Sequence, residues 1–104
     1  MSQFDNVSVV KQANVFFDGK CVSHSVLFPD GSRKSLGVIM PGSQLTFNVK
    51  TSEVMEITSG TCQVKVAGEA AAKTYTAGMQ FNVAADSSFE IHTQEVVNYV
   101  CSFG

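Results

Sequence analysis

The sequence predicts an all-β protein: a single small domain built as a β-barrel or jelly roll. The chain is rich in Val, Phe and Thr, residue types that favour strands. Gly and Pro interrupt it at intervals of about ten residues, which is typical of many short antiparallel strands. Between these interruptions apolar residues recur at every second position, so one face of each strand is expected to be buried.

Four short motifs mark the expected turns. They are F-P-D-G (28–31), M-P-G (40–42), S-G (59–60) and A-G (77–78). Each combines residues that fit the backbone of a tight turn. The turns therefore divide the chain into short strands.

Each expected strand carries apolar residues that share one face. In chain order these sets are Leu36, Val38 and Met40; Leu45, Phe47 and Val49; Met55 and Ile57; Cys62, Val64 and Val66; Phe81 and Val83; Phe89 and Ile91; and Val97, Tyr99, Cys101 and Phe103. The segment A-G-E-A-A-A-K (67–73) has a helix-forming composition but is short. We expect a loop there, with at most one helical turn.

Composition excludes several classes of protein. The 104 residues are enough for one domain with one core, and 44% of them are hydrophobic against 15% charged, as in globular proteins. The net charge is −2, and no basic cluster exceeds the pair Arg33-Lys34. We therefore expect no nucleic-acid partner. No apolar run reaches membrane-spanning length, so we expect no membrane partner either.

The N-terminus and the cysteines indicate a cytoplasmic protein. The start M-S-Q-F-D-N-V lacks a positive segment followed by an apolar run, so we expect no signal peptide. Cys21, Cys62 and Cys101 are odd in number and widely spaced. This pattern is typical of reduced thiols, and we expect all three to pack in the core.

Glu53 is out of place in its expected strand. It shares a face with Met55 and Ile57, whereas Val54 and Glu56 take the other face. Burying a carboxylate on an apolar face is unfavourable unless it is paired or hydrogen-bonded. Glu53 is therefore a candidate functional residue.

The spacing around Glu53 resembles that of a cupin. Gly60 follows after six residues, as in the second half of the first cupin motif, and T-A-G-x-x-F (76–81) resembles the second motif. The metal-binding histidines of that pattern are missing, because Phe81 replaces one and residues 46–49 contain none. His24 and His92 lie outside the motifs, without H-x-H or H-x3-H spacing. We expect no catalytic metal.

A more specific resemblance covers the chain from about residue 14 onward, leaving residues 1–13 outside it. It is carried by F-D-G-K (17–20), R-K-S-L-G-V-I-M-P-G (33–42), T-F (46–47), E-V-M-E-I-T-S-G (53–60), Y-T-A-G-M-Q-F-N-V (75–83), S-S-F (87–89) and Y-V-C (99–101). In this order and spacing they resemble the pyrimidine/purine nucleoside phosphorylase family. The resemblance implies a metal-free cupin that forms a homodimer. It also implies cleavage of many purine and pyrimidine nucleosides by phosphate, giving free base and ribose 1-phosphate.

Phosphorolysis of a nucleoside passes through an oxocarbenium-like sugar. Glu53 would accept hydrogen bonds from the ribose hydroxyls and stabilise the developing positive charge. Arg33, the only arginine, would hold the phosphate, because its planar guanidinium binds two oxygens at once. Ser35, two residues on and on the same strand face, could add a hydroxyl. Glu53 could instead be structural, and Arg33 could be a solvated residue at a turn.

Three further residues are candidates for contact with the base. Phe47 and Phe81 could stack on it, and Met55 would line the same cavity with a soft, adaptable side chain. Plain core packing is the alternative for both aromatic residues. Tyr75, Tyr99, His24 and His92 are the possible proton donors, although a base can also leave with a proton from water.

Two other functions agree with the same residues. One is a non-catalytic cupin that binds a nucleoside or sugar, and release of base that depends on phosphate separates it from the enzyme. The other is a metal cupin that uses Glu53 with His24 or His92. Activity that survives in metal-free protein would exclude the metal cupin.

Overall fold

The computed structural model describes residues 2–103 as eleven strands and one short 3-10 turn. The strands are β1 (Ser8–Val9), β2 (Asn14–Phe16), β3 (Cys21–Leu27), β4 (Arg33–Ile39), β5 (Ser43–Val49), β6 (Glu53–Ser59), β7 (Thr61–Val66), β8 (Lys73–Thr76), β9 (Gln80–Val83), β10 (Ser87–Thr93) and β11 (Val97–Phe103). The turn η1 (Phe17–Gly19) joins β2 to β3. In this part of the chain, no helix is long and apolar enough to cross a membrane.

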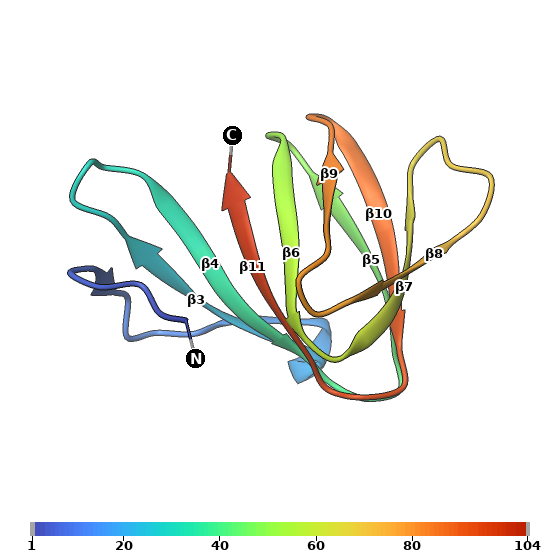
Figure 1. Cartoon of the computed structure of the whole chain (residues 1–104), viewed down its shortest axis with the longest axis horizontal. Coiled ribbons are helices and arrows are strands. Elements are labelled where there is room, and N and C mark those ends of the chain that lie inside the picture. Colours follow the sequence, from blue (N-terminus) through green and yellow to red (C-terminus); the bar gives the residue numbers. More distant parts are fainter. Residues whose placement is uncertain (1, 104) are drawn as a thin grey trace.

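The strands form two antiparallel sheets that face each other (Figure 1). Sheet A has the order β1-β3-β4-β11-β6-β9, with β2 also paired to β3, and sheet B has the order β5-β10-β7-β8. The chain crosses between the sheets several times, as expected for a jelly roll. The expected all-β architecture is confirmed.

The core fills the space between the sheets. Strand alternation directs Ile39, Ile57 and Val97 inward from sheet A, and Val64 and Ile91 inward from sheet B, and all five are fully buried. All three cysteines are also buried, as expected. The recurrence of apolar residues at every second position therefore predicted the buried face of most strands correctly.

Strand β4 uses a different face from the one its apolar residues suggest. Leu36 and Met40 are partly exposed on the outer face, whereas Gly37 and Ile39 face the core. Gly37 is paired with Tyr99 of β11, and a Cβ on Gly37 would overlap the Tyr99 ring. A glycine is needed here to make room for a large aromatic side chain.

The expected turns are present, and the loop at 67–72 contains no helix. Gly60 joins β6 to β7 with φ +89°, and a Cβ there would overlap the carbonyl of Val96. Glu69 stabilises the 67–72 loop by accepting a 2.9 Å hydrogen bond from the backbone N–H of Val66.

One end of the molecule is positioned to hold a site. The β5–β6 turn, the β9–β10 turn and the C-terminal end of β11 all lie at the upper end in Figure 1. Glu53 begins β6, Val83 ends β9 and Phe103 ends β11. Residues far apart in the sequence therefore meet at this end.

Candidate functional site

Glu53 lies on the inner face of sheet A, as its spacing predicts. It is partly buried, and Met55 and Ile57 on the same face are almost completely buried. Glu53 is paired with Phe103 of β11 on one side and with Val83 of β9 on the other. The carboxyl group is therefore flanked by apolar neighbours on both adjacent strands.

Arg33 lies on the far side of Phe103 from Glu53. It begins β4, and its guanidinium carbon lies 4.4 Å from the centre of the Phe103 ring. Such a stacked arrangement is a favourable cation–π contact. In residues 2–103 the one salt bridge joins Lys73 to Glu69, so neither Arg33 nor Glu53 has an ion-pair partner there.

Glu53 and Arg33 both act on a third group, the thiol of Cys101. Cys101 is 4% exposed and is paired with Ser35 of β4 and Met55 of β6. Burial and the carboxyl of Glu53 raise the pKa of the Cys101 thiol, while the charge of Arg33 lowers it. The three side chains therefore form one cluster on the inner face of sheet A.

The Glu53 carboxyl has a raised pKa. Burial raises its pKa above the usual value, because removing water disfavours the charged form. A hydrogen bond with the Cys101 side chain acts in the opposite direction and lowers it. Burial is the larger effect.

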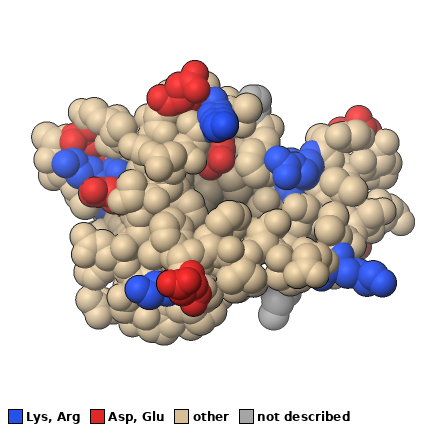
Figure 2. Space-filling model, turned by 180° about the vertical axis from the view of Figure 1, so that it is seen from behind, with Lys and Arg blue, Asp and Glu red and all other residues tan. Residues whose placement is uncertain are grey.

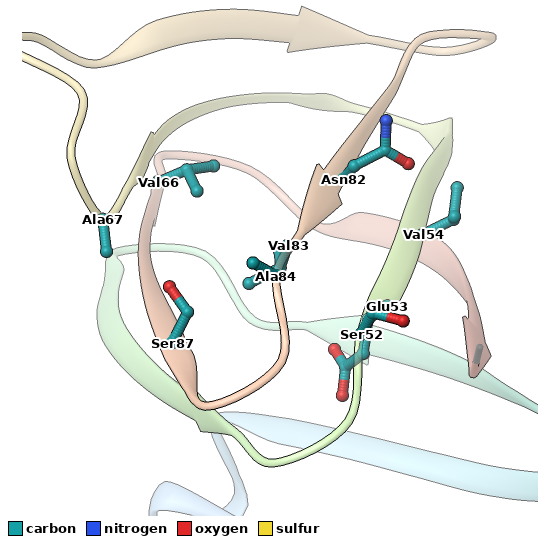
Figure 3. A pocket seen from close by; sticks show the side chains of 9 residues that line it. All are labelled: Ser52, Glu53, Val54, Val66, Ala67, Asn82, Val83, Ala84 and Ser87. Carbon is teal, nitrogen blue, oxygen red and sulfur yellow. The ribbon is translucent and has the colours of Figure 1, made fainter.

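A pocket of about 430 Å³ lies on the β9 side of Glu53. This volume falls within the range of roughly 300–1,000 Å³ common for small-molecule sites. It is lined by Ser52, Glu53, Val54, Val66, Ala67, Asn82, Val83, Ala84 and Ser87. Figure 3 shows Ser52 and Glu53 on one wall and Val66, Ala67 and Ser87 on the opposite wall, with Val83 and Ala84 between them. The pocket therefore opens between the two sheets, with a carboxyl group at its side.

Ser35 lies where its spacing from Arg33 predicts. It is buried on the inner face of β4, two residues along from Arg33, and is paired with Cys101. Arg33, Phe103 and Glu53 form one row of side chains across three strands. The Ser35 hydroxyl lies in the next row.

Phe47, Met55 and Phe81 lie deeper in the molecule than the pocket. Phe47 stacks on Phe89 with ring centres 5.1 Å apart, and Phe81 packs against Phe89 at 5.3 Å. Met55 is 3% exposed and pairs with Phe81. None of the three lines the pocket beside Glu53. Contact between these side chains and a base stays a prediction.

Two lysines are engaged in other contacts, and one of the possible proton donors, His92, points outward. Lys73 makes a 3.0 Å salt bridge with Glu69, and Lys34 lies over the Phe4 and Phe28 rings. His92 is partly exposed on the outer face of β10, as its spacing predicts. Within residues 2–103, no three His, Cys, Asp or Glu side chains come close enough together to hold a metal ion.

Phe103 and Cys101 could not be recognised from the sequence as neighbours of the site. Both belong to the core pattern of β11, as expected, but the pairing of β4, β11 and β6 is what brings them close to Arg33 and Glu53. Ser52, Asn82 and Ser87 were also missed, because they are ordinary polar residues at strand ends. Cys101, Asn82 and Ser87 did have a signal, since each lies within a segment that supports the family resemblance, whereas Ser52 and Phe103 lie in none of these segments.

A family model of pyrimidine/purine nucleoside phosphorylases matches residues 11–103. The chain belongs to this family. A pyrimidine/purine nucleoside phosphorylase of Cupriavidus taiwanensis is 62% identical over 103 residues, covering 99% of this chain and 97% of the relative. One from Methylobacillus flagellatus is 58% identical and covers 99% of both chains. The resemblance identified from the sequence is confirmed.

Solved structures agree with the fold. A protein of unknown function from Acinetobacter sp. ADP1 is 48% identical, with a TM-score of 0.95 and coverage of 98% of each chain. A cupin-2 domain from Rhodospirillum rubrum is 11% identical, with a TM-score of 0.73 and coverage of 100% of this chain and 73% of that one. The second likeness concerns the fold alone and confirms the expected cupin architecture.

Proposed function

We propose that this protein is an enzyme that cleaves the N-glycosidic bond of purine and pyrimidine nucleosides with inorganic phosphate. The products are the free base and ribose 1-phosphate, and no metal takes part. Family membership supports the class of reaction. The observation that carries the proposal for this chain is the position of Glu53, between a pocket of about 430 Å³ and the stacked guanidinium of Arg33.

Each reactant has a plausible partner in this arrangement. The base would occupy the pocket between the sheets, and the ribose would lie against Glu53. Phosphate would bind at Arg33, whose backbone is two strand spacings from that of Glu53, or roughly 10 Å. The Phe103 ring supports the guanidinium without using its hydrogen-bond donors. Ser35 supplies a further hydroxyl on the Arg33 side.

The reaction needs positioning and charge stabilisation more than a covalent group. The bond from C1′ of the ribose to the base nitrogen breaks, and a phosphate oxygen bonds to C1′ in its place. The ribose hydroxyls would donate to the Glu53 carboxylate, which also stabilises the positive charge that develops on the sugar. The departing base takes its proton from water.

The nature of the pocket supports a broad substrate range. Its apolar lining is aliphatic, from Val54, Val66, Ala67, Val83 and Ala84. Aliphatic side chains exclude water from any base but make no hydrogen bonds to its polar groups. An apolar pocket therefore discriminates weakly between similar ligands. Purines and pyrimidines would therefore both be accepted.

Two further properties belong to the proposal. The protein would be cytoplasmic, which agrees with three buried cysteines that form no disulfide. It would also form a homodimer, because the outer face of sheet A carries apolar side chains that a second copy could cover.

Lys, Arg, Asp and Glu side chains are scattered over the face shown in Figure 2 and form no basic patch for nucleic acid.

The test is release of base from uridine, adenosine, inosine and guanosine, each with and without phosphate. We expect several of them to release base only with phosphate, together with ribose 1-phosphate, and chelator-treated protein to keep this activity. If no nucleoside releases base, the protein is better described as a cupin that only binds a small ligand. Loss of activity on chelation, restored by a metal, would contradict the metal-free reaction.

A further inference from the structure

Cys101 is a buried side chain that lies next to the row formed by Arg33, Phe103 and Glu53. Its pairing with Ser35 on β4 and Met55 on β6 places it one residue pair further into the sheet than Phe103 and Glu53. Cys101 and Glu53 share the inner face and are diagonal neighbours on adjacent strands. Long side chains can make contact across such a diagonal, and the Cys101 side chain is near enough to the Glu53 carboxyl to lower its pKa.

The surroundings of Cys101 keep its proton in place. The thiol is almost completely buried, and burial together with the nearby Glu53 carboxyl raises its pKa. A protonated thiol is a donor, whereas a carboxylate only accepts. In a contact between these two side chains, the Cys101 S–H is therefore the donor and the Glu53 carboxylate is the acceptor.

We propose that Cys101 is a positioning residue that holds the Glu53 carboxylate, ionised and correctly oriented, at the wall of the pocket. This inference rests on the proposed function of Glu53. A carboxylate at the start of a strand can turn toward solvent, and a buried donor beneath it favours the inward conformation. The hydrogen bond also favours the charged form, which is the form that accepts from the ribose hydroxyls. Cys101 itself need not touch the substrate.

The charged and titratable groups around this pair come from three strands. Glu53 lies on β6, Arg33 is the cation on β4 that lowers the pKa of Cys101, and Tyr99 on β11 is a further titratable group, whose own pKa is raised by Cys101. β9 contributes only apolar inward side chains, Phe81 and Val83. A change in the acidity of Glu53 after substitution of Cys101 would therefore report on the thiol itself.

The experiment measures the pKa of Glu53 directly, by ¹³C NMR titration of its carboxyl group, and compares it with the pH profile of kcat for uridine. Cys101→Ala and Cys101→Val remove the donor, and the Val variant fills the space if the Ala variant fails to fold. Cys101→Ser keeps a donor. Cys62→Ala is the matched control, because Cys62 is an equally buried thiol on β7 of sheet B.

We expect the Glu53 pKa to rise in Cys101→Ala and Cys101→Val and to return toward the wild-type value in Cys101→Ser. The acid limb of kcat should move with it, and kcat near pH 6 should fall about tenfold, as expected for the loss of a hydrogen bond to a charged group. Cys62→Ala should change neither property. An unchanged Glu53 pKa in the Ala and Val variants would overturn the inference. Because the titration needs no substrate, it decides this point even if the wild-type protein releases no base.

Discussion

At the scale of single residues, Glu53 has an unfavourable place in the fold. It lies on a face of β6 whose next members, Met55 and Ile57, are core residues. Burial of its carboxyl raises the pKa, so the ionised form destabilises the folded state. A group kept at such a site despite this cost is a strong functional candidate.

The stability of the protein should report this cost as a function of pH. The folded-state pKa of Glu53 lies above its usual value of 4.5. Its contribution to the free energy of unfolding is therefore fully present below that value and is lost as the pH rises through the folded-state pKa. Glu53→Gln removes this dependence, so its stability relative to wild type should increase from pH 4 to pH 7 in urea unfolding.

Glu56→Gln is the matched control for this experiment. Glu56 lies on the exposed face of the same strand, where its carboxylate is already in water. The control should not gain stability over the same pH range. Equal behaviour of the two variants would contradict the buried environment assigned to Glu53.

Arg33 should contribute more to the binding of phosphate than to the binding of nucleoside. Removing a charge-assisted hydrogen-bond donor typically costs about 1.5–3 kcal/mol, equivalent to a change of at least tenfold in affinity. In steady-state kinetics, Arg33→Ala should raise KM for phosphate on the order of tenfold and change KM for uridine much less. Lys34→Ala, on the opposite face of β4, is the control. Equal weakening of both substrates would show that Arg33 is not the phosphate ligand.

At the scale of secondary-structure elements, the contact between β4 and β11 shapes the inner face of sheet A. Gly37 lies opposite Tyr99, whose hydroxyl is 3.4 Å from the sulfur of Cys21. The missing side chain at Gly37 is what admits the phenol ring. The same two strands carry Arg33 and Cys101, so their packing supports the site.

Gly37→Ala should destabilise the protein. The new methyl group would overlap the Tyr99 ring, and overpacking of a tight core typically costs about 1–3 kcal/mol. The measurement is the free energy of unfolding in urea. Gln44→Ala is the control, because the Gln44 side chain is exposed on β5 in sheet B, away from this contact. A loss no larger than in the control would show that Tyr99 can move aside at little cost.

The sequence predicted the strands well because their signal is local. Alternation of apolar residues identifies the buried face of β5, β10 and β11 from a few neighbouring residues. It failed to identify the core face of β4, where Gly37 shows no apolar side chain to indicate burial. The reason for that glycine lies on β11, far away in the sequence.

The candidate site was only partly predictable for the same reason. Glu53 and Arg33 could be found, since a lone carboxylate on an apolar face and a lone arginine are visible in the sequence. That Glu53 and Arg33 both lie next to Phe103 and Cys101 depends on the register of three strands. Register is set by tertiary pairing and by turn geometry, which local patterns do not specify.

At the scale of the whole molecule, we expect a second copy of the chain to cover the outer face of sheet A. Leu36 on β4 and Met40 directly after β4 are 39% and 36% exposed. Their neighbours on the adjacent strands include Val22 and Val100, which are partly buried. Apolar residues on an unpaired sheet face are typically covered by a partner.

Light scattering during size-exclusion chromatography should therefore give twice the mass of the 11.1 kDa chain. Leu36→Lys places a charge on this face and should shift the protein toward the monomer. Thr46→Lys, on the exposed side of β5 in sheet B, should leave the mass unchanged. A wild-type monomer, or a dimer that Leu36→Lys leaves intact, would contradict this assignment.

Whether this chain uses Glu53 in phosphorolysis can be decided by a single kinetic comparison. It is kcat for phosphate-dependent release of uracil from uridine, measured for the wild type, Glu53→Gln and Glu56→Gln. Loss of a group that stabilises transition-state charge typically lowers kcat by a factor of about 10²–10³. We expect a loss of this size in folded Glu53→Gln and none in Glu56→Gln. Full activity in folded Glu53→Gln would show that Glu53 has no part in the reaction.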